Sequence, residues 1–405
     1  MQTQLTKRFQ ESTEGKEADA ILRSCVHCGF CNATCPTYQL LGDELDGPRG
    51  RIYLIKSLLE GVPVTHKTQT HLDRCLSCRA CETTCPSGVR YGRLLDIGRN
   101  YVEQQVARTI FDNTRRYLLR KVIPNTILFS ALLTLGKIFK PVLPESLKSK
   151  IPVVQKRERW PATDHARKML ILEGCAQSVV SAGTNLATAR VLDQLSISLV
   201  VVQRAGCCGA VSHHLSAHEE ALTFARRNID AWWPHIAAEK IEAIVVTASG
   251  CGVMLKDYAV LLKHDTNYAT KAQRVSELAK DISEIIANEK PLSIPHKKPN
   301  RKVAYHSPCT LQHGQKLNGL VESLLEKSGI ELTPVNDAHL CCGSAGTYSI
   351  LQEELSLQLR DNKLAALLHN KPDVIATANI GCQMHLAAKA GVPVVHWIEL
   401  LDDRE

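Results

Sequence analysis

Three features that define other protein classes are scarce or missing in this sequence. Aromatic residues make up only 5% of its 405 residues and no nucleic-acid-binding motif is present, which argues against a nucleic-acid partner. The opening stretch MQTQLTKRFQESTEGKEAD is polar and lacks the apolar segment of a secretion signal. We find no Gly-rich dinucleotide fingerprint and no evident acid and base for hydride abstraction. These absences favour a cytoplasmic protein and argue against a chain that itself abstracts hydride from a substrate.

Long hydrophobic runs are also missing. The most apolar stretch, Val122 to Leu143, is interrupted by prolines, lysines and an asparagine, and its uninterrupted part covers only Ile127 to Leu135. A helix that spans a bilayer needs about 20 apolar residues. We therefore predict no transmembrane helix.

Charge is distributed unevenly along the chain. Residues Arg108 to Lys168 contain 14 Lys and Arg against 4 Asp and Glu, a local charge of +10, so the rest of the +8 chain carries −2. This basic segment could be a membrane-surface element, a contact for a partner subunit, or a solvated linker. The stretch RRYLLRK (115–121), followed by apolar residues, is typical of an amphipathic helix lying on a membrane. It predicts peripheral association with the cytoplasmic (inner) membrane.

Cysteine, in contrast, is abundant, with 16 residues. Eight lie in two runs, CVHCGFCNATCP (25–36) and CLSCRACETTCP (75–86). This C-x2-C-x2-C-x3-C-P spacing is the bacterial ferredoxin pattern, in which three thiolates of a run bind one [4Fe–4S] cluster and the fourth binds the other cluster. The predicted ligands are Cys25, Cys28, Cys31 and Cys85 for the first cluster, and Cys75, Cys78, Cys81 and Cys35 for the second.

Two alternatives to these clusters are structural zinc and a dithiol redox centre. Zinc sites usually pair two C-x2-C units and stop at four ligands, unlike these runs. Arg49 and Arg51 are candidates to pair with cluster charge, although a solvated helix start explains them equally well.

The other eight cysteines belong to an internal repeat. KMLILEGC (168–175) resembles RKVAYHSPC (301–309), RAGCCGA (204–210) resembles HLCCGSAG (339–346), and IEAIVVTASGCG (241–252) resembles PDVIATANIGC (372–382). The first Cys precedes the doublet by 32 positions in both copies, and the last follows it by 44 and 41. Each copy alternates strands and helices, which predicts a parallel sheet. The cysteines follow strand ends, where such sheets bind ligands.

Clustered thiols at such an edge form a soft metal or cluster site, whereas the alternative is that they are small buried apolar residues. The candidate ligands are Cys175, Cys207, Cys208 and Cys251 in the first copy, and Cys309, Cys341, Cys342 and Cys382 in the second. Nearby histidines are weaker candidates, because a lone His is more often structural. These histidines are His213, His214, His306 and His385. Trp232 and Trp233 are predicted to lie in a core or an interface rather than to relay electrons.

The predicted fold class is thus mixed α+β and α/β. A small helical two-cluster ferredoxin-type domain (1–107), with helices over 45–61 and 92–106, precedes a basic amphipathic linker (108–167). Two Cys-Cys-Gly domains with parallel sheets (168–295 and 296–405) follow.

This arrangement resembles the iron–sulfur subunits of membrane-associated dehydrogenases, including those of anaerobic glycerol-3-phosphate dehydrogenase, lactate utilisation systems and heterodisulfide reductase. The motifs CVHCGFCNATCPTYQLLGDELDGPRGRIYLIK, CLSCRACETTCPSGVRY, LEGCAQ, AGCCGAV, NIDAWWP and TASGCG are most similar to the glycolate oxidase iron–sulfur subunits, over nearly the whole chain. The resemblance implies a complex in which FAD-binding subunits oxidise glycolate to glyoxylate and this chain passes electrons toward a membrane quinone.

The chain departs from this pattern in one respect. Heterodisulfide reductase relatives carry a further Cys in C-x2-C spacing after the last one, and here those positions are Met254 and His385. The resemblance therefore does not transfer the non-cubane clusters of those relatives to this chain. Each Cys-Cys-Gly site could hold a different cluster, another metal or nothing. D-lactate or glycerol-3-phosphate as the substrate of the complex, and a stand-alone thiol or disulfide reductase, remain alternatives.

Overall fold

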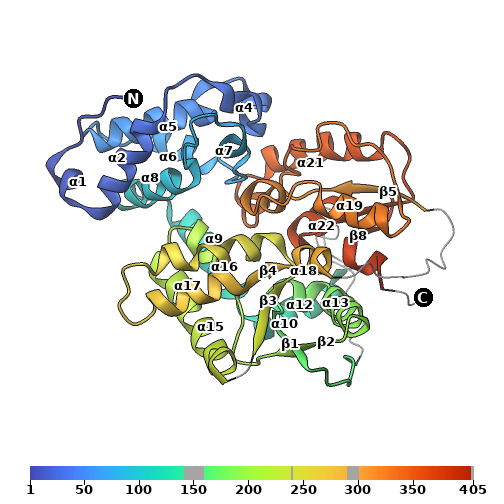
Figure 1. The fold of residues 1–405 in the computed structure, drawn as a ribbon. Coiled ribbons are helices and arrows are strands. Elements are labelled where there is room, and N and C mark those ends of the chain that lie inside the picture. Colours follow the sequence, from blue (N-terminus) through green and yellow to red (C-terminus); the bar gives the residue numbers. More distant parts are fainter. Residues whose placement is uncertain (141–158, 239, 290–300, 403–405) are drawn as a thin grey trace. The chain divides into compact units, whose positions relative to one another are not determined.

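The protein folds into two compact units in a computed structural model that describes residues 1–140, 159–238, 240–289 and 301–402 (Figure 1). Unit 1 comprises Met1–Arg116 and His339–Lys363, and unit 2 comprises Tyr117–Ala338 and Leu364–Glu405. This division differs from the domain boundaries expected from the repeat. The stretch that contains the second cysteine doublet groups with the N-terminal helices, not with the rest of its own repeat.

Unit 1 is entirely helical. Its N-terminal elements are α1 (Lys7–Glu11), α2 (Thr13–Ser24), α3 (Phe30–Ala33), α4 (Pro36–Leu41), η1 (Glu44–Asp46), α5 (Pro48–Leu59), α6 (His66–Asp73), α7 (Ala80–Thr84) and α8 (Tyr91–Gln105). Two further helices, α20 (Tyr348–Leu351) and the start of α21 (Glu353–Leu368), come from the later segment. Helices α5 and α8 match the two helices predicted from the sequence.

Close packing of α5 against α8 forms the centre of unit 1. Pro48 starts α5, where its missing N–H is not needed for a helical hydrogen bond. Ile55 is completely buried, and a Cβ added at Gly98 of α8 would lie only 2.7 Å from the Ile55 side chain. Glycine at position 98 is therefore what lets the two helices approach, and the pair supports the loops that carry the cysteines.

Unit 2 contains two four-stranded parallel sheets with the orders β2-β1-β3-β4 and β6-β5-β7-β8. The strands are β1 (Arg167–Leu172), β2 (Ile197–Val201), β3 (Ile241–Val246), β4 (Ala279–Asp281), β5 (Lys302–His306), β6 (Glu331–Leu332), β7 (Val374–Thr377) and β8 (Val394–His396). The predicted parallel sheets are confirmed. Each sheet has a fourth edge strand that the sequence repeat did not reveal.

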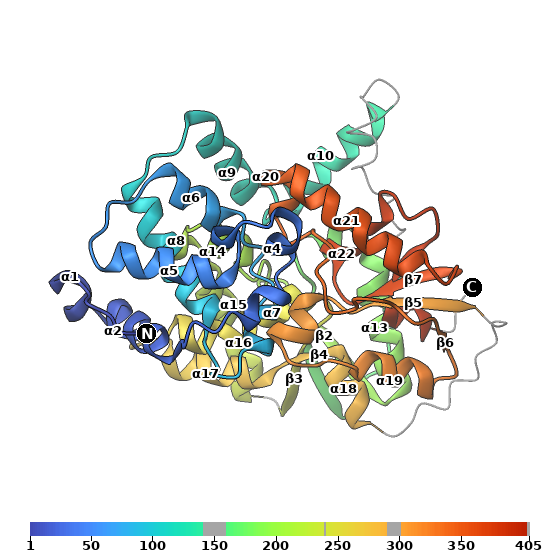
Figure 2. The same ribbon diagram turned by 90° about the horizontal axis from the view of Figure 1, so that it is seen from above.

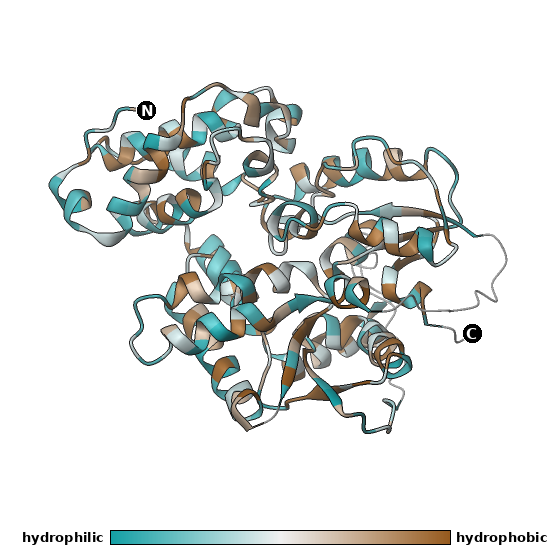
Figure 3. Cartoon of the chain, in the orientation of Figure 1, coloured by the Kyte–Doolittle hydropathy of each residue, from teal (hydrophilic) through white to brown (hydrophobic). Residues whose placement is uncertain are grey.

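Helices cover the sheets of unit 2, as Figure 2 shows from above. They are α10 (Thr126–Ile138), α12 (Gln177–Val180), α13 (Ala182–Gln194), α14 (Ala210–His214), α15 (His218–Ala238), α16 (Ser249–Leu261), α17 (Ala269–Leu278), α18 (Ile282–Asn288), η3 (Thr310–Gly314), α19 (Leu320–Lys327), α22 (Ile380–Ala387) and η4 (Trp397–Leu400). Alternate residues of β1 serve two cores: Met169 and Ile171 pack with α13 and α18, and Leu170 and Leu172 pack with α15 and α16. Burial on both faces explains the continuous apolar strands, brown in Figure 3.

The two repeats of unit 2 share one hydrophobic core, which includes residues of both β1 and β5. Backbone and side-chain hydrogen bonds also join them. Ser249 N–H donates to the Ala378 carbonyl at 3.1 Å, and His396 Nε2 donates to the Thr247 carbonyl at 2.8 Å. Burial lowers the pKa of His396 to about 4, so this imidazole is neutral at pH 7. The repeats therefore fold as one body.

The basic segment is partly helical and partly outside the described residues, which omit 141–158. Within the described ranges no single helix is long and apolar enough to cross a membrane. Helices α9 (Ile110–Val122) and α10 together have sufficient length and apolar character, but a bend of 108° separates them. Several cations of α9 are already paired: Arg116 bonds to Asp112 and Asp73, and Lys121 bonds to Glu220 at 2.9 Å. Part of the local positive charge therefore serves internal ion pairs.

Candidate iron–sulfur and thiol sites

Both ferredoxin-type runs wrap around their cysteines through the same backbone turns. The second residue after the first cysteine has a positive φ in each run, 61° at His27 and 54° at Ser77. The residue after the second cysteine does so too, 88° at Gly29 and 60° at Arg79. Left-handed residues curl the chain so that the flanking thiols face one centre.

The structure gathers the first predicted ligand set. Cys25, Cys28, Cys31 and Cys85 all line one small cavity, together with Cys81 of the neighbouring set. Burial, together with the charges of Cys25, Cys28 and Cys85, raises the pKa of Cys31 to about 11. Cys85 thus lies with the thiols of the other run, as the crossed pattern requires.

The second predicted set gathers in the same way. Burial raises the pKa of Cys81 well above its usual value, and Cys78, Cys75 and Cys35 add to this effect. Four crowded thiolates are costly without a bound cation, so both sets have the donor chemistry of a soft, positively charged group such as an iron–sulfur cluster.

The two sets differ in the groups that contact their sulfur atoms. Around the second set, the Tyr91 hydroxyl donates to Cys75 Sγ at 3.5 Å and the Ser77 N–H donates to the same sulfur at 3.4 Å. Thr37 Oγ1 lies 3.3 Å from Cys35 Sγ. Hydrogen bonds to cluster sulfur stabilise the more negative, reduced state.

A buried guanidinium lies beside the second set. Arg51 is only 1% exposed and binds Asp46, which is completely buried, whereas Arg49 beside the first set is 34% exposed and binds Glu44. Burial opposes the charge of Arg51, but Cys75, Tyr91, Cys35 and Asp46 raise its pKa above the usual value. The positive charge near the second set is therefore permanent and shielded from solvent.

The second cysteine doublet shares unit 1 with these sets. Tyr348 of α20 is 6% exposed. Burial raises its pKa, and Cys75 and Cys341 add to the shift. The Arg115 guanidinium donates to the Ile350 carbonyl and holds α20 against α9. Tyr348 is therefore near enough to both the second ferredoxin-type set and the doublet for their charges to act on its hydroxyl.

The four thiols of the first Cys-Cys-Gly copy form a continuous cluster in unit 2. Cys207 hydrogen-bonds with Cys175 and Cys208, and Cys208 hydrogen-bonds with Cys251. The bonds from Cys175 and Cys208 lower the pKa of Cys207 well below its usual value, and the Gly209 N–H and the Arg227 charge contribute. The same hydrogen bonds to Cys207 raise the pKa values of Cys175 and Cys208. Four clustered cysteine sulfurs, with the pKa of Cys207 lowered, fit a soft metal or cluster.

A polar shell holds this doublet in place. Asn228 Nδ2 donates to the Cys207 carbonyl at 3.0 Å, and the buried Tyr258 hydroxyl donates to the Cys208 carbonyl at 2.8 Å. A Cβ added at Gly206 would lie 2.7 Å from the Arg227 guanidinium, so this side chain would have to shift. These hydrogen bonds hold the backbone of the doublet in place.

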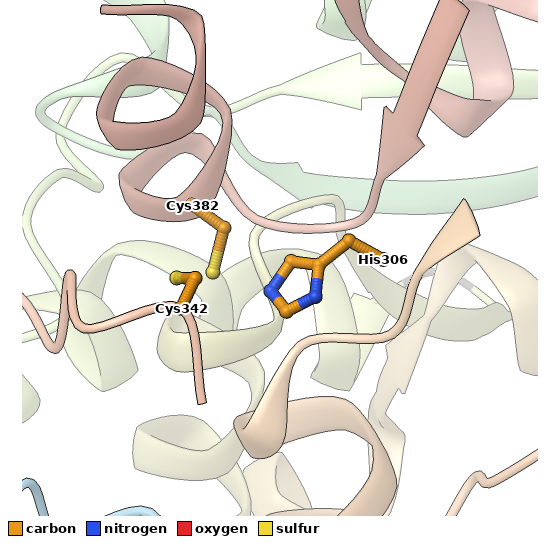
Figure 4. Close-up of side chains that lie close together, drawn as sticks. All are labelled: His306, Cys342 and Cys382. Atoms are coloured by element: carbon orange, nitrogen blue, oxygen red, sulfur yellow. The ribbon is translucent and has the colours of Figure 1, made fainter. Parts of the chain in front are cut away.

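In the second copy, three side chains point toward one another (Figure 4). His306, Cys342 and Cys382 each offer one ligand atom, and these atoms all lie within 4.8 Å of one another. The Gly343 N–H donates to Cys341 Sγ at 3.4 Å, as Gly209 does to Cys207 in the first copy. The second site therefore includes a histidine that the first copy does not offer.

Comparisons with known proteins agree with this arrangement. A model of the 4Fe-4S dicluster domain matches residues 21–89, and a model of the cysteine-rich domain matches residues 169–256 and 303–387. The glycolate oxidase iron-sulfur subunit of Escherichia coli (strain K12) is 57% identical over 403 residues, covering 99% of this chain and 98% of that protein. The chain belongs to the glycolate oxidase iron–sulfur subunit family. It is therefore an iron–sulfur protein, and its family implies electron transfer within an oxidoreductase complex.

More distant relatives match all or part of the chain. The probable glycolate oxidase iron-sulfur subunit of Bacillus subtilis (strain 168) is 29% identical and covers 98% of this chain and 96% of that protein. Lactate utilization protein A of Bacillus licheniformis is 26% identical over 58% of this chain and 100% of its own length. The chain is also similar in structure to a hypothetical protein from Helicobacter pylori, known from a crystal structure, with a TM-score of 0.51. The match has 12% sequence identity and covers 98% of this chain and 74% of that one, so it shows the fold alone.

Sequence reasoning missed most of the side chains that contact the sulfur atoms or the backbone of the cysteines. Tyr91, Thr37, Asn228 and Tyr258 lie 16, 2, 21 and 50 positions from the cysteines that they contact. Among the charged groups beside the two sets, the sequence indicates Arg49 and Arg51. Of the remaining candidates, Trp232 is fully buried in a core, as predicted. Among the described residues, neither His213 nor His214 belongs to a group of three or more potential metal ligands.

Proposed function

We propose that this chain is the electron-transfer subunit of a flavin-dependent glycolate oxidase complex associated with the cytoplasmic membrane. The observation that carries the proposal is the pair of crossed four-thiol sets. Two [4Fe–4S] clusters bound there would accept and release electrons one at a time. FAD on a partner subunit would take the two electrons released when glycolate becomes glyoxylate, and a quinone-type acceptor would receive them.

The environment of the two sets gives the electron flow a direction. Cys28 is exposed, so an external donor comes closest to the first set. Arg51, the Tyr91 hydroxyl and the Ser77 N–H stabilise added negative charge at the second set, which therefore has the higher reduction potential. Tyr348 then extends the route toward the second doublet.

The Cys-Cys-Gly sites are proposed as further metal or cluster sites. Cys175, Cys207, Cys208 and Cys251 would be the ligands of the first site, with the Arg227 charge balancing the anionic thiolate. In the second copy, Cys309, Cys341, Cys342 and Cys382 would be joined or partly replaced by His306. Iron and zinc analysis of the full chain tests this part. More than about eight irons per chain supports filled sites, since two four-iron clusters account for eight.

Membrane association rests on α10. Its side chains Phe129 and Leu133 pack against a small core formed by Val180, Ala248 and Ile380, while Ile127 and Ile138 are 83% and 67% exposed. An apolar face left outward beside a basic helix is suited to the interface of an anionic membrane.

The decisive experiment is a pull-down of the tagged full chain from its native cell, followed by activity assays with glycolate, D-lactate and glycerol 3-phosphate. Copurification of an FAD protein and selective glycolate oxidation are expected. Selective oxidation of D-lactate or glycerol 3-phosphate would instead show that the chain is a subunit of a different dehydrogenase complex.

The low pKa of Cys207 also favours a second candidate, a stand-alone thiol or disulfide reductase. Disulfide turnover by the purified chain without partners would support this candidate over the first.

A further inference from the structure

The first Cys-Cys-Gly copy contains a cavity of about 550 Å³ at the carboxyl ends of β1 and β2. Cys175 and Cys207 form part of its wall, while Cys208 and Cys251 are not among its lining residues. One side of the thiol cluster therefore faces a space of the size that binds a small molecule. Carboxyl ends of strands are where open parallel sheets bind ligands.

The wall of this cavity is both polar and apolar. Arg204, Arg227 and Gln203 supply donors, and Ile171 and Leu186 supply an apolar surface. Arg204 is exposed and makes no hydrogen bond or ion pair within the described ranges, so its guanidinium is available to a ligand. The wall suits a molecule with carbonyl oxygens that gain negative charge, because guanidinium groups donate strong, charge-assisted hydrogen bonds to such oxygens.

The cavity also adjoins the exposed apolar helix. Pro124 and Thr126, at the start of α10, are lining residues, and Ile127 next to them is 83% exposed. The rest of α10 is fixed to the same copy through Phe129 and Leu133. A lipophilic molecule could therefore place its head group in the cavity while its apolar tail lies along α10.

From this juxtaposition we infer that the cavity is the binding site of the lipophilic quinone, with its ring beside Cys175 and Cys207 and its tail along α10. The inference rests on the proposed function and locates its acceptor. The reduced chain supplies two electrons, solvent supplies two protons, and the quinone leaves as the quinol. Arg204 and Arg227 hold the ring oxygens while negative charge builds up on them.

Two variants test the site in the full complex. Arg204→Gln removes a donor at an exposed position, and Ala182→Phe fills part of the cavity from α13. Lys271→Gln, a surface lysine that contacts Trp233 and does not line the cavity, is the matched charge control. Each protein is reduced with dithionite and mixed with a benzoquinone carrying one isoprenoid unit, or with ferricyanide, which is hydrophilic and needs no such cavity.

The expected result is selective for the quinone. Arg204→Gln raises the quinone concentration at half-maximal reoxidation about tenfold, as the loss of one charged hydrogen bond predicts, and Ala182→Phe abolishes saturation. Ferricyanide reoxidation and the Lys271→Gln control stay unchanged. Photolabelling with an azidoquinone should mark peptides of β2 or α13 in the parent protein but not in Ala182→Phe.

Unchanged quinone kinetics in both variants, or photolabel elsewhere in the complex, overturns the inference. This failure is distinct from that of the proposed function. If the complex still oxidises glycolate with ferricyanide while the variants leave quinone kinetics intact, only the location is wrong. If the complex oxidises no glycolate, reoxidation of the dithionite-reduced protein still reports on the site.

Discussion

Replacing Arg51 by methionine tests how the second ferredoxin-type set is stabilised. The variant removes a guanidinium that is 1% exposed and retains an apolar side chain of similar length. Arg51 donates from Nε to the His71 carbonyl at 2.7 Å and from Nη2 to Asp46 at 3.4 Å. It also reaches Thr37, which contacts Cys35. The substitution therefore changes folding stability and the charge near the second set together.

The stability effect follows from the orphaned carboxylate. Removing one partner of a buried ion pair typically costs about 3–5 kcal/mol. Asp46 keeps Arg74 at 2.8 Å and His71 at 3.1 Å, so we expect the lower end of that range for Arg51→Met. The variant should therefore fold and load iron, with a reduced free energy of unfolding.

The redox effect follows from Coulomb's law. A unit charge about 6 Å from a cluster at an effective dielectric constant of about 20 contributes about 3 kcal/mol. Asp46 cancels part of it, which leaves about 1–2 kcal/mol, equal to about 40–80 mV for a one-electron couple. Arg51→Met should lower the reduction potential of the second cluster by this amount, because the reduced state loses its stabilising cation.

The assay is a redox titration of the iron-loaded full chain followed by electron paramagnetic resonance. Arg51→Lys keeps the charge and should retain most of the potential. Arg49→Met, at the 34% exposed arginine of the first set, should have a small effect because solvent already screens that charge. If Arg51→Met and Arg49→Met shift the potentials equally, or if Arg51→Met shifts neither while iron content is preserved, the reasoning is refuted.

Three further predictions test other parts of the structure. Cys85→Ser should remove the first cluster signal and Cys35→Ser the second, measured by iron content and electron paramagnetic resonance; loss of each run's own cluster instead would contradict the crossed ligand sets. His396 has a pKa of about 4 in the folded protein, so below pH 6.5 its imidazole takes up a proton in the unfolded chain but not in the folded one. The free energy of unfolding should therefore fall by up to about 3 kcal/mol between pH 6.5 and 4. Urea unfolding should show this slope in the parent and a flatter one in His396→Gln. The double variant Ile127→Gln, Ile138→Gln should release the complex from anionic vesicles at moderate salt without loss of iron; continued binding would place the anchor elsewhere.

The sequence alone predicted the elements whose signals are local. Cysteine spacing identified the two ferredoxin-type runs, since a cluster needs three ligands within a few residues of one another. The alternation of strands and helices in each repeat predicted parallel sheets, because parallel strands need a crossover helix between them. The short fourth strands escaped notice, since Ala279–Asp281 and Val394–His396 are three residues long and bring no cysteine with them.

What the sequence could not decide depends on contacts between distant segments. The repeat indicated separate domains, yet both sheets share one core, and the second doublet groups with the N-terminal helices. Nothing in the local sequence distinguishes Arg51, which is buried beside Cys75, from Arg49, which faces solvent two positions earlier. The sequence by itself determined which residues can bind iron, because ligand chemistry and spacing are covalent properties of the chain. Tertiary structure alone decided their environment, because burial, charge and the cavity beside Cys207 arise only when remote residues pack together.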